Sequence, residues 1–498
     1  MQQYRKHLFY IVLIVFLFAG GLIIRLYDLQ DAPLDFHPTR QLHSALMARG
    51  IYYFISPNLE VSEWQRVTGI HQWKLEGLVE PPLLEWLVAF TYKLVSGVYL
   101  WIARLYAILF WMLAAVGVWW LAKKISGQTG SVIALSFFLY YPYGVYASRS
   151  FQPETLLVAF LVFTILSVLQ WEKHKNWKWA IATGLIGGIT ILIKAVAIFF
   201  VAGIWLGLLF SHMKLKAMIK NRQLWIIACL LILPYALFIY YATYIVGGYE
   251  GQFSLRFFPQ MWTQIGFYLR WIGTLRLAVG LEWLVMGLLG VLLIKERNWR
   301  WILLGAWLGY VLLGFTLSYH ISTHDYYNLP VYIMTALGLG VMLNKLVSFN
   351  SNNVWVRFAA ISLLILVIST YSYESYSLLK RNNFNQEIAF WQTLGEELGH
   401  EARIVALSED YGYRLAYWGW ISPTNWMNTE DIRLRKEAGQ TFDFERYFNT
   451  TIQDKDYFVI TLLNELEKQP QLNDHLCSHF KIIKQSDRLI VFDLRTPL

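Results

Sequence analysis

The sequence predicts an all-α polytopic membrane protein with about 11 transmembrane helices, followed by a small α/β soluble domain. Three observations support this fold class. Hydrophobic residues make up 56% of the 498 residues and charged residues only 15%, whereas soluble domains carry roughly 25% charged residues. Apolar runs of membrane-spanning length recur over most of the chain. The residues from about 373 onward are instead polar.

The apolar runs define the predicted transmembrane helices. A helix needs about 20 apolar residues to cross a bilayer, and the runs that approach this length are 8–26, 99–122, 130–147, 153–171, 177–193, 195–211, 222–246, 277–294, 300–319, 326–344 and 354–372. A further run, 82–97, is shorter and contains Glu85 and Lys93. We expect it to form a helix at the membrane interface, within the first outer loop.

Basic residues between the runs predict which side of the membrane each connection faces. Lysine and arginine gather in every second connection, beginning with Arg5 and Lys6, and cytoplasmic loops carry such an excess. We therefore expect a cytoplasmic N-terminus and a C-terminal domain outside a plasma membrane, specifically a bacterial inner membrane. The net charge of +9 comes mostly from these connections. It indicates topology and contact with anionic lipid, and not nucleic-acid binding.

The same pattern predicts the domain organisation. Residues 1–372 are expected to form the transmembrane catalytic domain, with a first outer loop at 28–98, and residues 373–498 the soluble α/β domain. In the tail, residues 386–398 have helical periodicity. Three short apolar runs are typical of buried strands: 402–408, 457–462 and 489–494.

Asp35 is the first candidate for chemistry at the predicted outer face. It lies in Asp-Phe-His-Pro, shortly after the first apolar run, with His37 and Arg40 beside it. A carboxylate in this place is a candidate general base for an acceptor hydroxyl or amine. The alternatives are a solvated loop acid or the N-cap of a helix over 39–50.

Glu80, Arg149 and Glu154 are expected at the same face. Glu80 precedes two prolines that fix the entry to the 82–97 helix, so it either serves a site or complements the helix dipole. Arg149 and Glu154 belong to a short turn between two runs. Arg149 suits a lipid phosphate because its planar guanidinium matches that group. The alternative is a structural Arg149–Glu154 ion pair.

Lys194 and the segment 324–327 complete the candidates. Lys194 stands alone between two apolar runs, where an ammonium suits a phosphate at headgroup level; the alternative is snorkelling to the interface. His324 and Asp325, just before a late predicted span, are candidates for substrate contact. Tyr326 and Tyr327 either stack on a sugar or belong to the aromatic belt.

Taken together, these residues point to one chemistry. Carboxylates facing water, with isolated cations at headgroup level, fit a donor linked to a lipid phosphate that acts as the leaving group. Arg149 and Lys194 would hold the phosphate, and Asp35 would deprotonate the acceptor. The histidines match no known ligand spacing, so no metal site is assigned to His37, His43, His71, His320 or His324.

The motifs resemble those of the GT-C class of membrane glycosyltransferases, in the branch of the protein O-mannosyltransferases and the lipid A aminoarabinose transferase. The likeness covers most of 1–372 and follows the family order: the acid Asp35, Pro-Pro-Leu-x-x-Trp at 81–86, Ser-Arg with a later acid at 148–154, Lys194, and Tyr-Tyr-x-Leu-Pro at 326–330. Three positions depart from the family. They are Phe36 where a second acid is common, Glu154 where Asp is common, and Glu80 where Lys or His is common.

The resemblance implies inverting transfer of a sugar from a polyprenyl-phosphate-sugar donor to a lipid, glycan or protein acceptor at the outer face. Asp35 would be the base, Glu154 would position the sugar or groups near the phosphate, and Arg149 and Lys194 would hold the phosphate. Tyr326 and Tyr327 would line the donor cavity. No cofactor is assigned, since the need for a divalent metal varies among relatives.

Three other functions compete with this interpretation. A transporter or flippase of lipid-linked glycans predicts ionisable residues near the membrane midplane and broken helices, whereas the charges here gather at one face. A glycan ligase shares the predicted topology but moves a preassembled chain. A scaffold acting through its tail predicts that residues before about 373 have no transferase activity of their own.

Overall fold

The computed structural model describes residues 2–57, 60–247, 256–349 and 353–498. The chain divides into two compact units. Unit 1 comprises residues 1–29, 78–84 and 101–382, and unit 2 comprises residues 30–77, 85–100 and 383–498. The first predicted outer loop thus contributes most of its residues to the same unit as the tail, and each unit is described separately below.

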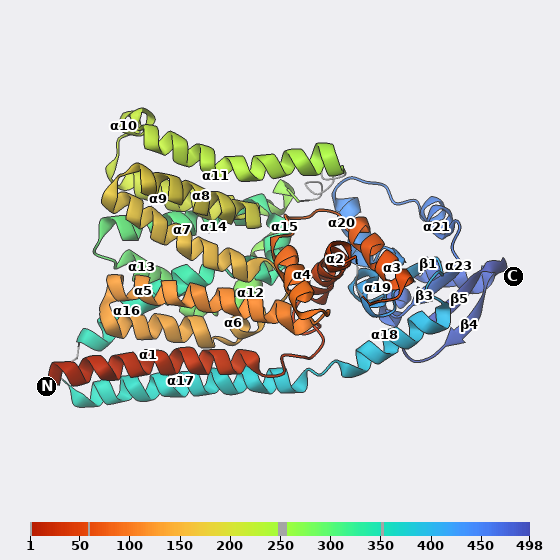
Figure 1. Ribbon diagram of the computed structural model, residues 1–498, viewed down its shortest axis with the longest axis horizontal. Helices are drawn as coiled ribbons and strands as arrows, with labels where there is room; N and C mark the ends of the chain where they lie inside the picture. Colours follow the sequence, from red (N-terminus) through yellow and green to blue (C-terminus); the bar gives the residue numbers. More distant parts are fainter. Residues whose placement is uncertain (1, 58–59, 248–255, 350–352) are drawn as a thin grey trace. The chain divides into compact units, whose positions relative to one another are not determined.

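Unit 1 is built from helices that run alongside one another (Figure 1). Its longer helices are α1 (Gln2–Leu26), α5 (Leu100–Tyr140), α7 (Glu154–His174), α8 (Trp177–Ile193), α9 (Ala197–His212), α11 (Arg222–Tyr240), α12 (Ile265–Ala278), α13 (Leu281–Leu292), α14 (Arg297–Thr316), α16 (Val331–Phe349) and α17 (Val354–Arg381). Short helical segments connect them: α6 (Pro142–Ala147), α10 (Leu215–Lys220), η1 (Tyr241–Val246), η3 (Pro259–Thr263), α15 (Ser318–Thr323) and η4 (Asp325–Asn328). The mostly helical, multi-pass architecture that the sequence predicts is confirmed.

The expected number of eleven spans is not confirmed. Among the described residues, seven helices are long and apolar enough to cross a membrane, or eight if α12 and α13 form one bent span. Two causes account for three of the missing spans. The predicted spans at 99–122 and 130–147 join into the single element α5, which is interrupted at Gly127 with φ of 73°. The helices α8 and α9 have only 17 and 16 residues.

The segment around α12 and α13 also differs from the prediction. A connection was expected at 247–276 and a span at 277–294, but residues 265–278 form helix α12, followed by α13 at an angle of 88°. Gly280, with φ of 78°, lies between them. Arg270 and Arg276 lower the hydropathy of α12, so the sequence did not mark it as apolar. Residues 248–255 of the predicted connection lie outside the described residues.

Glycines allow the helices of unit 1 to pack closely. A Cβ on Gly203 of α9 would lie 2.1 Å from the carbonyl oxygen of Gly305 of α14. A Cβ on Gly290 of α13 would lie 1.9 Å from the carbonyl oxygen of Gly338 of α16. Close backbone approach through small residues is the usual way in which membrane helices associate. This close packing fixes α9, which follows Lys194, and α16, which follows Tyr326 and Tyr327.

Unit 2 combines helices with one mixed sheet. Its helices are α2 (Pro38–Ile55), α3 (Glu63–Leu75), most of α4 (Leu83–Val95), α18 (Asn385–Leu398), η5 (Glu409–Gly412), α19 (Tyr413–Trp418), α20 (Thr429–Glu437), α21 (Phe444–Ile452), α22 (Leu463–Glu467) and α23 (Pro470–His479). The sheet has the strand order β2-β1-β3-β5-β4. β1 (Ile404–Leu407) pairs in parallel with β2 (Thr424–Asn425) and β3 (Tyr457–Ile460), whereas β5 (Ile490–Pro497) is antiparallel to β3 and to β4 (Phe480–Gln485).

The secondary structure of the tail agrees with the sequence patterns. The predicted helix and three predicted strands are confirmed as α18, β1, β3 and β5. The strands β2 and β4 had not been predicted. β2 has only two residues, and β4 is almost entirely exposed after Phe480, so neither has the apolar run of a buried strand. The transmembrane helix α17 continues to Arg381, nine residues past the expected boundary at 372.

Arg49 ties the first loop into unit 2. This buried side chain donates hydrogen bonds to the Tyr417 carbonyl (2.6 Å) and to Gln72 Oε1 (2.7 Å). Its guanidinium lies 3.9 Å from the ring centroid of Trp420, within range of a cation–π contact. Helices α2 and α3 are therefore held against the tail by polar contacts as well as by apolar packing.

Candidate active site

Lys194 is the centre of a buried polar cluster in unit 1. Its Nζ pairs with Glu154 Oε1 and lies 3.5 Å from Glu80 Oε1. Lys194 is only 4% exposed and Glu154 only 2%. Three residues that the sequence singled out separately, Glu80, Glu154 and Lys194, are thus brought together from three different segments of the chain.

The local backbone positions the side chains of Lys194 and Glu154. Lys194 occupies the break between α8 and α9 in an extended conformation, with φ of −156° and ψ of 123°. Glu154 is the first residue of α7, after the N-cap residue Pro153. A carboxylate in the first turn of a helix is stabilised by the free N–H groups and the dipole there. Each side chain therefore starts from an interrupted or terminal backbone position and not from the middle of a span.

The carboxylates keep Lys194 charged. Burial alone lowers the pKa of Lys194, but the negative charges of Glu154 and Glu80 outweigh it and raise that pKa above its ordinary value. An ammonium has three N–H donors, of which the two carboxylates use at most two. The cluster can accordingly offer a further donor to an anionic ligand. The alternative, that Lys194 snorkels to the interface, is not favoured, because the charge of Lys194 is paired inside the protein.

Two tyrosines cover the same ammonium group. Lys194 Nζ lies 4.9 Å from the ring centroid of Tyr326 and 4.8 Å from that of Tyr327. Both rings are buried, and they stack on each other at 5.0 Å. Placement over a buried cation assigns these rings to the cluster and not to an aromatic belt at the bilayer surface.

The segment 325–328 is itself held in place by hydrogen bonds. The Tyr310 hydroxyl donates to Asn328 Oδ1 at 2.5 Å, and Trp271 Nε1 donates to the Tyr310 hydroxyl at 2.7 Å. Asp325 lies beside the partly buried side chain of Tyr143. Asp325 and the preceding His324 both belong to unit 1, and the His324 ring contacts Tyr326 and Tyr327.

His320 was not predicted as a site residue on its own, yet it lies in this group. Its ring stacks on His324 at 5.4 Å and contacts Tyr327. Burial, the neighbouring His324 and the cations Arg256 and Lys194 lower the pKa of His320 to about 3. It is consequently a neutral imidazole at physiological pH, a group able both to donate and to accept a hydrogen bond.

Arg149 lies in a second cationic group of unit 1, around the carbonyl of Asp28. Arg149 and Arg104 both donate to this oxygen, at 2.8 and 3.2 Å. Arg25 donates to Ser148 Oγ at 2.7 Å, next to Arg149 in the chain. Arg25 and Arg104 were not predicted as site residues. An arginine inside a predicted span is a functional candidate in its own right, and the run 99–122 contains Arg104, so this signal was present.

Asp35, His37 and Arg40 belong to unit 2. His37, and not Asp35, is the N-cap residue of α2, with φ of 46° and no side-chain capping bond, so Asp35 does not cap the helix. Asp35 is partly exposed, and the Gln41 amide approaches its Oδ1 at 3.5 Å. The same amide donates to the Phe36 carbonyl at 2.7 Å. Gln41 therefore fixes the backbone that carries Asp35.

No metal ligand set emerges from the described residues. Within them, no three His, Cys, Asp or Glu side chains gather closely enough to hold a metal ion. The carboxylates Glu80 and Glu154 converge on an ammonium group, as described above. In this cluster the carboxylates neutralise the Lys194 ammonium, and the ammonium suits the binding of a phosphate. No metal is assigned to these residues.

Comparison with solved structures identifies the fold. ArnT from Cupriavidus metallidurans, bound to undecaprenyl phosphate, superposes with a TM-score of 0.62 at 14% identity, covering 96% of this chain and 97% of that one. AglB, the oligosaccharyltransferase of Archaeoglobus fulgidus, superposes in complex with an inhibitory peptide and a dolichol-phosphate, with a TM-score of 0.61 at 12% identity, covering 98% of this chain and 75% of that one. The chain has the GT-C fold. The fold expected from the short motifs is thus confirmed.

The sequence comparisons support the GT-C assignment over part of the chain. The family profile described as dolichyl-phosphate-mannose-protein mannosyltransferase matches residues 79–241. No curated protein sequence gives a significant match. The GT-C-like profile match contains Glu80, Arg149, Glu154 and Lys194, which are the cluster carboxylates and two of the candidate cations. Asp35 and the tyrosine pair lie outside the matched residues.

Proposed function

We propose that this protein transfers a sugar from a polyprenyl-phosphate-sugar donor to an acceptor at the outer face of the membrane. One observation carries the proposal: within a GT-C fold, a buried and charged Lys194 is covered by two tyrosines and flanked by two carboxylates. A paired ammonium beside aromatic rings provides a contact for a phosphate and a surface for a sugar. Undecaprenyl phosphate in ArnT and dolichol-phosphate in AglB support a lipid-phosphate donor.

In the proposed reaction, the bond between the sugar C1 and the phosphate oxygen breaks as an acceptor oxygen or nitrogen attacks C1 from the opposite side. The acceptor proton passes to Asp35, and the polyprenyl phosphate leaves with the bonding electrons. Arg149 and Lys194 stabilise the negative charge on the departing phosphate. Glu154 orients Lys194 and groups near the sugar, and Tyr326 and Tyr327 line the donor cavity.

The test is turnover of radiolabelled undecaprenyl- and dolichyl-phosphate hexoses by the purified full chain in lipid. The wild type is expected to release polyprenyl phosphate or to transfer the label. Asp35→Asn is expected to bind donor normally but to lose turnover by about 10²-fold or more, as removal of a general base commonly does. Glu63→Gln, an exposed acid of the same loop with a side chain 72% accessible, serves as the matched control and should keep full turnover.

Normal turnover by Asp35→Asn would exclude Asp35 as the base. It would still support a polyprenyl-phosphate sugar as the donor. If no polyprenyl-phosphate sugar binds the wild type, the proposed donor is wrong. One observation then favours a second function: the 88° bend between α12 and α13 is of the kind found in the broken helices of transporters. Movement of lipid-linked glycan across vesicles that contain the protein, without release of polyprenyl phosphate, would establish it.

A further inference from the structure

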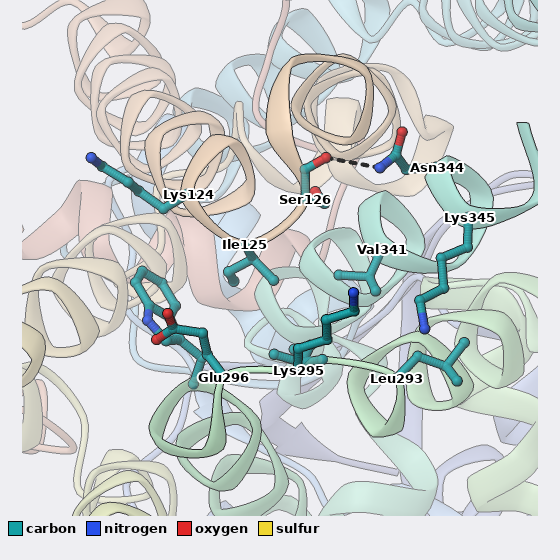
Figure 2. A pocket seen from close by; sticks show the side chains of 11 residues that line it. Lys124, Ile125, Ser126, Leu293, Lys295, Glu296, Val341, Asn344 and Lys345 are labelled. Atoms are coloured by element: carbon teal, nitrogen blue, oxygen red, sulfur yellow. Dashed lines mark hydrogen bonds between the residues drawn. The ribbon is translucent and has the colours of Figure 1, made fainter. Parts of the chain in front are cut away.

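A cavity in unit 1 carries positive charge and has no role in the chemistry proposed above. It has a volume of about 310 Å³ and is shown in Figure 2. Its lining comes from three places: the middle of α5, the α13–α14 connection and the end of α16. The lining residues include Lys124, Lys295, Lys345, Glu296, Ser126 and Asn344. Three lysines and one glutamate leave the lining with a net positive charge.

The cavity is separate from the Lys194 cluster. Helix α16 starts at Val331, directly after the tyrosine pair, and reaches the cavity at Asn344 and Lys345. Fourteen residues of α-helix span about 20 Å. The two sites therefore lie near opposite ends of one helix, at a separation of roughly two thirds of the thickness of a bilayer core, which is about 30 Å.

Two of the lysines converge within the cavity. Figure 2 shows the side chains of Lys295 and Lys345 extending toward each other from the α13–α14 connection and from α16, whereas Lys124 extends away. Lys124 instead lies 5.5 Å from the ring centroid of Trp120. In the part of the chain that the structure describes, neither Lys295 nor Lys345 forms an ion pair with a carboxylate. Like charges that point at one another repel unless an anion lies between them.

The cavity wall beside Lys295 and Lys345 is polar on one side and apolar on the other. The Asn344 amide donates to the Ser126 carbonyl at 2.9 Å, which joins α16 to α5 and closes one wall (Figure 2). Ile125, Val341 and Leu293 supply apolar surface, and Leu293 is 38% exposed. Leu292, next to it, is 50% exposed. A ligand that is anionic at one end and apolar at the other matches this lining.

We propose that this cavity binds the phosphate headgroup of an anionic phospholipid, with Lys295 and Lys345 on the phosphate and an acyl chain along Leu292 and Leu293. The ligand chemistry is a phosphate ester anion. The adjoining exposed leucines favour a lipid over free phosphate. Basic pockets between transmembrane helices are known to bind such headgroups. The site would anchor the α13–α14 connection to α16 through the lipid.

The experiment titrates the purified full chain, in detergent, with phosphatidylglycerol, phosphatidylcholine or inorganic phosphate, and counts bound ligands by native mass spectrometry. The test variant is Lys295→Gln with Lys345→Gln. The matched control is Lys216→Gln with Lys220→Gln, two exposed lysines of α10 outside the cavity. An unchanged thermal midpoint of both double variants shows that they are folded.

We expect wild type to bind phosphatidylglycerol more tightly than phosphatidylcholine. The test variant should lose about 25-fold in phosphatidylglycerol affinity, at roughly fivefold for each lysine near an anionic headgroup, while the control stays within about twofold. Equal losses in both variants would mean unspecific charge attraction and overturn the site. Undiminished binding by the test variant would overturn it as well. Displacement of phosphatidylglycerol by an equal concentration of inorganic phosphate would reject the lipid in favour of free phosphate.

Discussion

Lys194 and Glu154 form an ion pair that is almost completely withdrawn from solvent, between the α8–α9 break and the first turn of α7. Glu80 adds a second carboxylate at 3.5 Å. Removing one member of such a pair leaves an uncompensated charge, whereas replacing both members by neutral groups does not. A comparison of the single variant of Lys194 with the double variant of Lys194 and Glu154 can therefore distinguish the structural role of the pair from its proposed role in binding the donor.

Replacement of Lys194 by methionine should therefore destabilise unit 1 by about 3–5 kcal/mol, because Glu154 is left buried and charged. The double variant Lys194→Met with Glu154→Gln should recover most of that stability but no donor turnover. Thermal unfolding and release of polyprenyl phosphate are the two measurements. Recovery of both quantities in the double variant would mean that Lys194 serves only the fold.

Glu76 should make the stability of unit 2 depend on pH. It contacts His43 at 3.4 Å and accepts a hydrogen bond from the Tyr413 hydroxyl at 2.8 Å. Burial raises the pKa of Glu76 to about 7, although the Tyr413 hydrogen bond opposes the shift. The ordinary value is 4.5, so between these values the folded protein holds a proton that the unfolded chain has lost. The stabilising contribution is complete below pH 4.5 and is lost as pH rises to about 7.

We expect the unfolding midpoint of wild type, relative to that of Glu76→Gln, to fall as pH rises from 4.5 to 7, and then to stay level. Glutamine cannot titrate, so its variant provides the reference at each pH. Glu63→Gln should follow the wild-type curve because Glu63 is exposed. Parallel curves for wild type and Glu76→Gln would show that the shift in the pKa of Glu76 is absent.

The contact between α9 and α14 should not tolerate a methyl group. A Cβ on Gly305 would lie 2.0 Å from the Gly203 carbonyl oxygen, and backbone cannot move aside as a flexible side chain does. Gly305→Ala should thus destabilise unit 1 by about 1–3 kcal/mol or more, as overpacking commonly does. Gly273→Ala in α12 is the control, since nothing lies within 4 Å of its Cβ. Equal thermal midpoints for the two variants would contradict the close packing.

The sequence predicted the fold class well and the span boundaries less well. Apolar periodicity identified most helices of unit 1, α18 and the three buried strands, because the buried or lipid-facing positions of these elements carry apolar side chains. It did not identify α12, where two arginines interrupt the apolar run, or the edge strand β4, which is mostly exposed. These elements depend on neighbours that a local pattern does not contain.

The candidate site was predicted in part. Lys194, Glu154 and Glu80 were each chosen for charge close to an apolar run, and the structure brings them together. Their pairing was not predicted, since the one ion pair considered for Glu154, as an alternative, was with Arg149. His320, Arg25 and Arg104 were missed. Arg25 and Arg104 lie inside predicted spans, where an arginine is a functional candidate, but their contacts join segments distant in sequence. The role of Asp35 stays a prediction.

Unit 2 is assembled from segments that lie far apart in the sequence, and this has a consequence for biogenesis. Arg49, in α2, is synthesised more than three hundred residues before Tyr417 and Trp420. The Arg49 guanidinium donates to the Tyr417 carbonyl and lies over the Trp420 ring. Domains otherwise fold as units while synthesis proceeds. Here the early segment must wait, with the Arg49 guanidinium and apolar faces still uncovered, until residues 383–498 have been synthesised. The time between the synthesis of α2 and the synthesis of α19 would therefore affect the yield of folded unit 2.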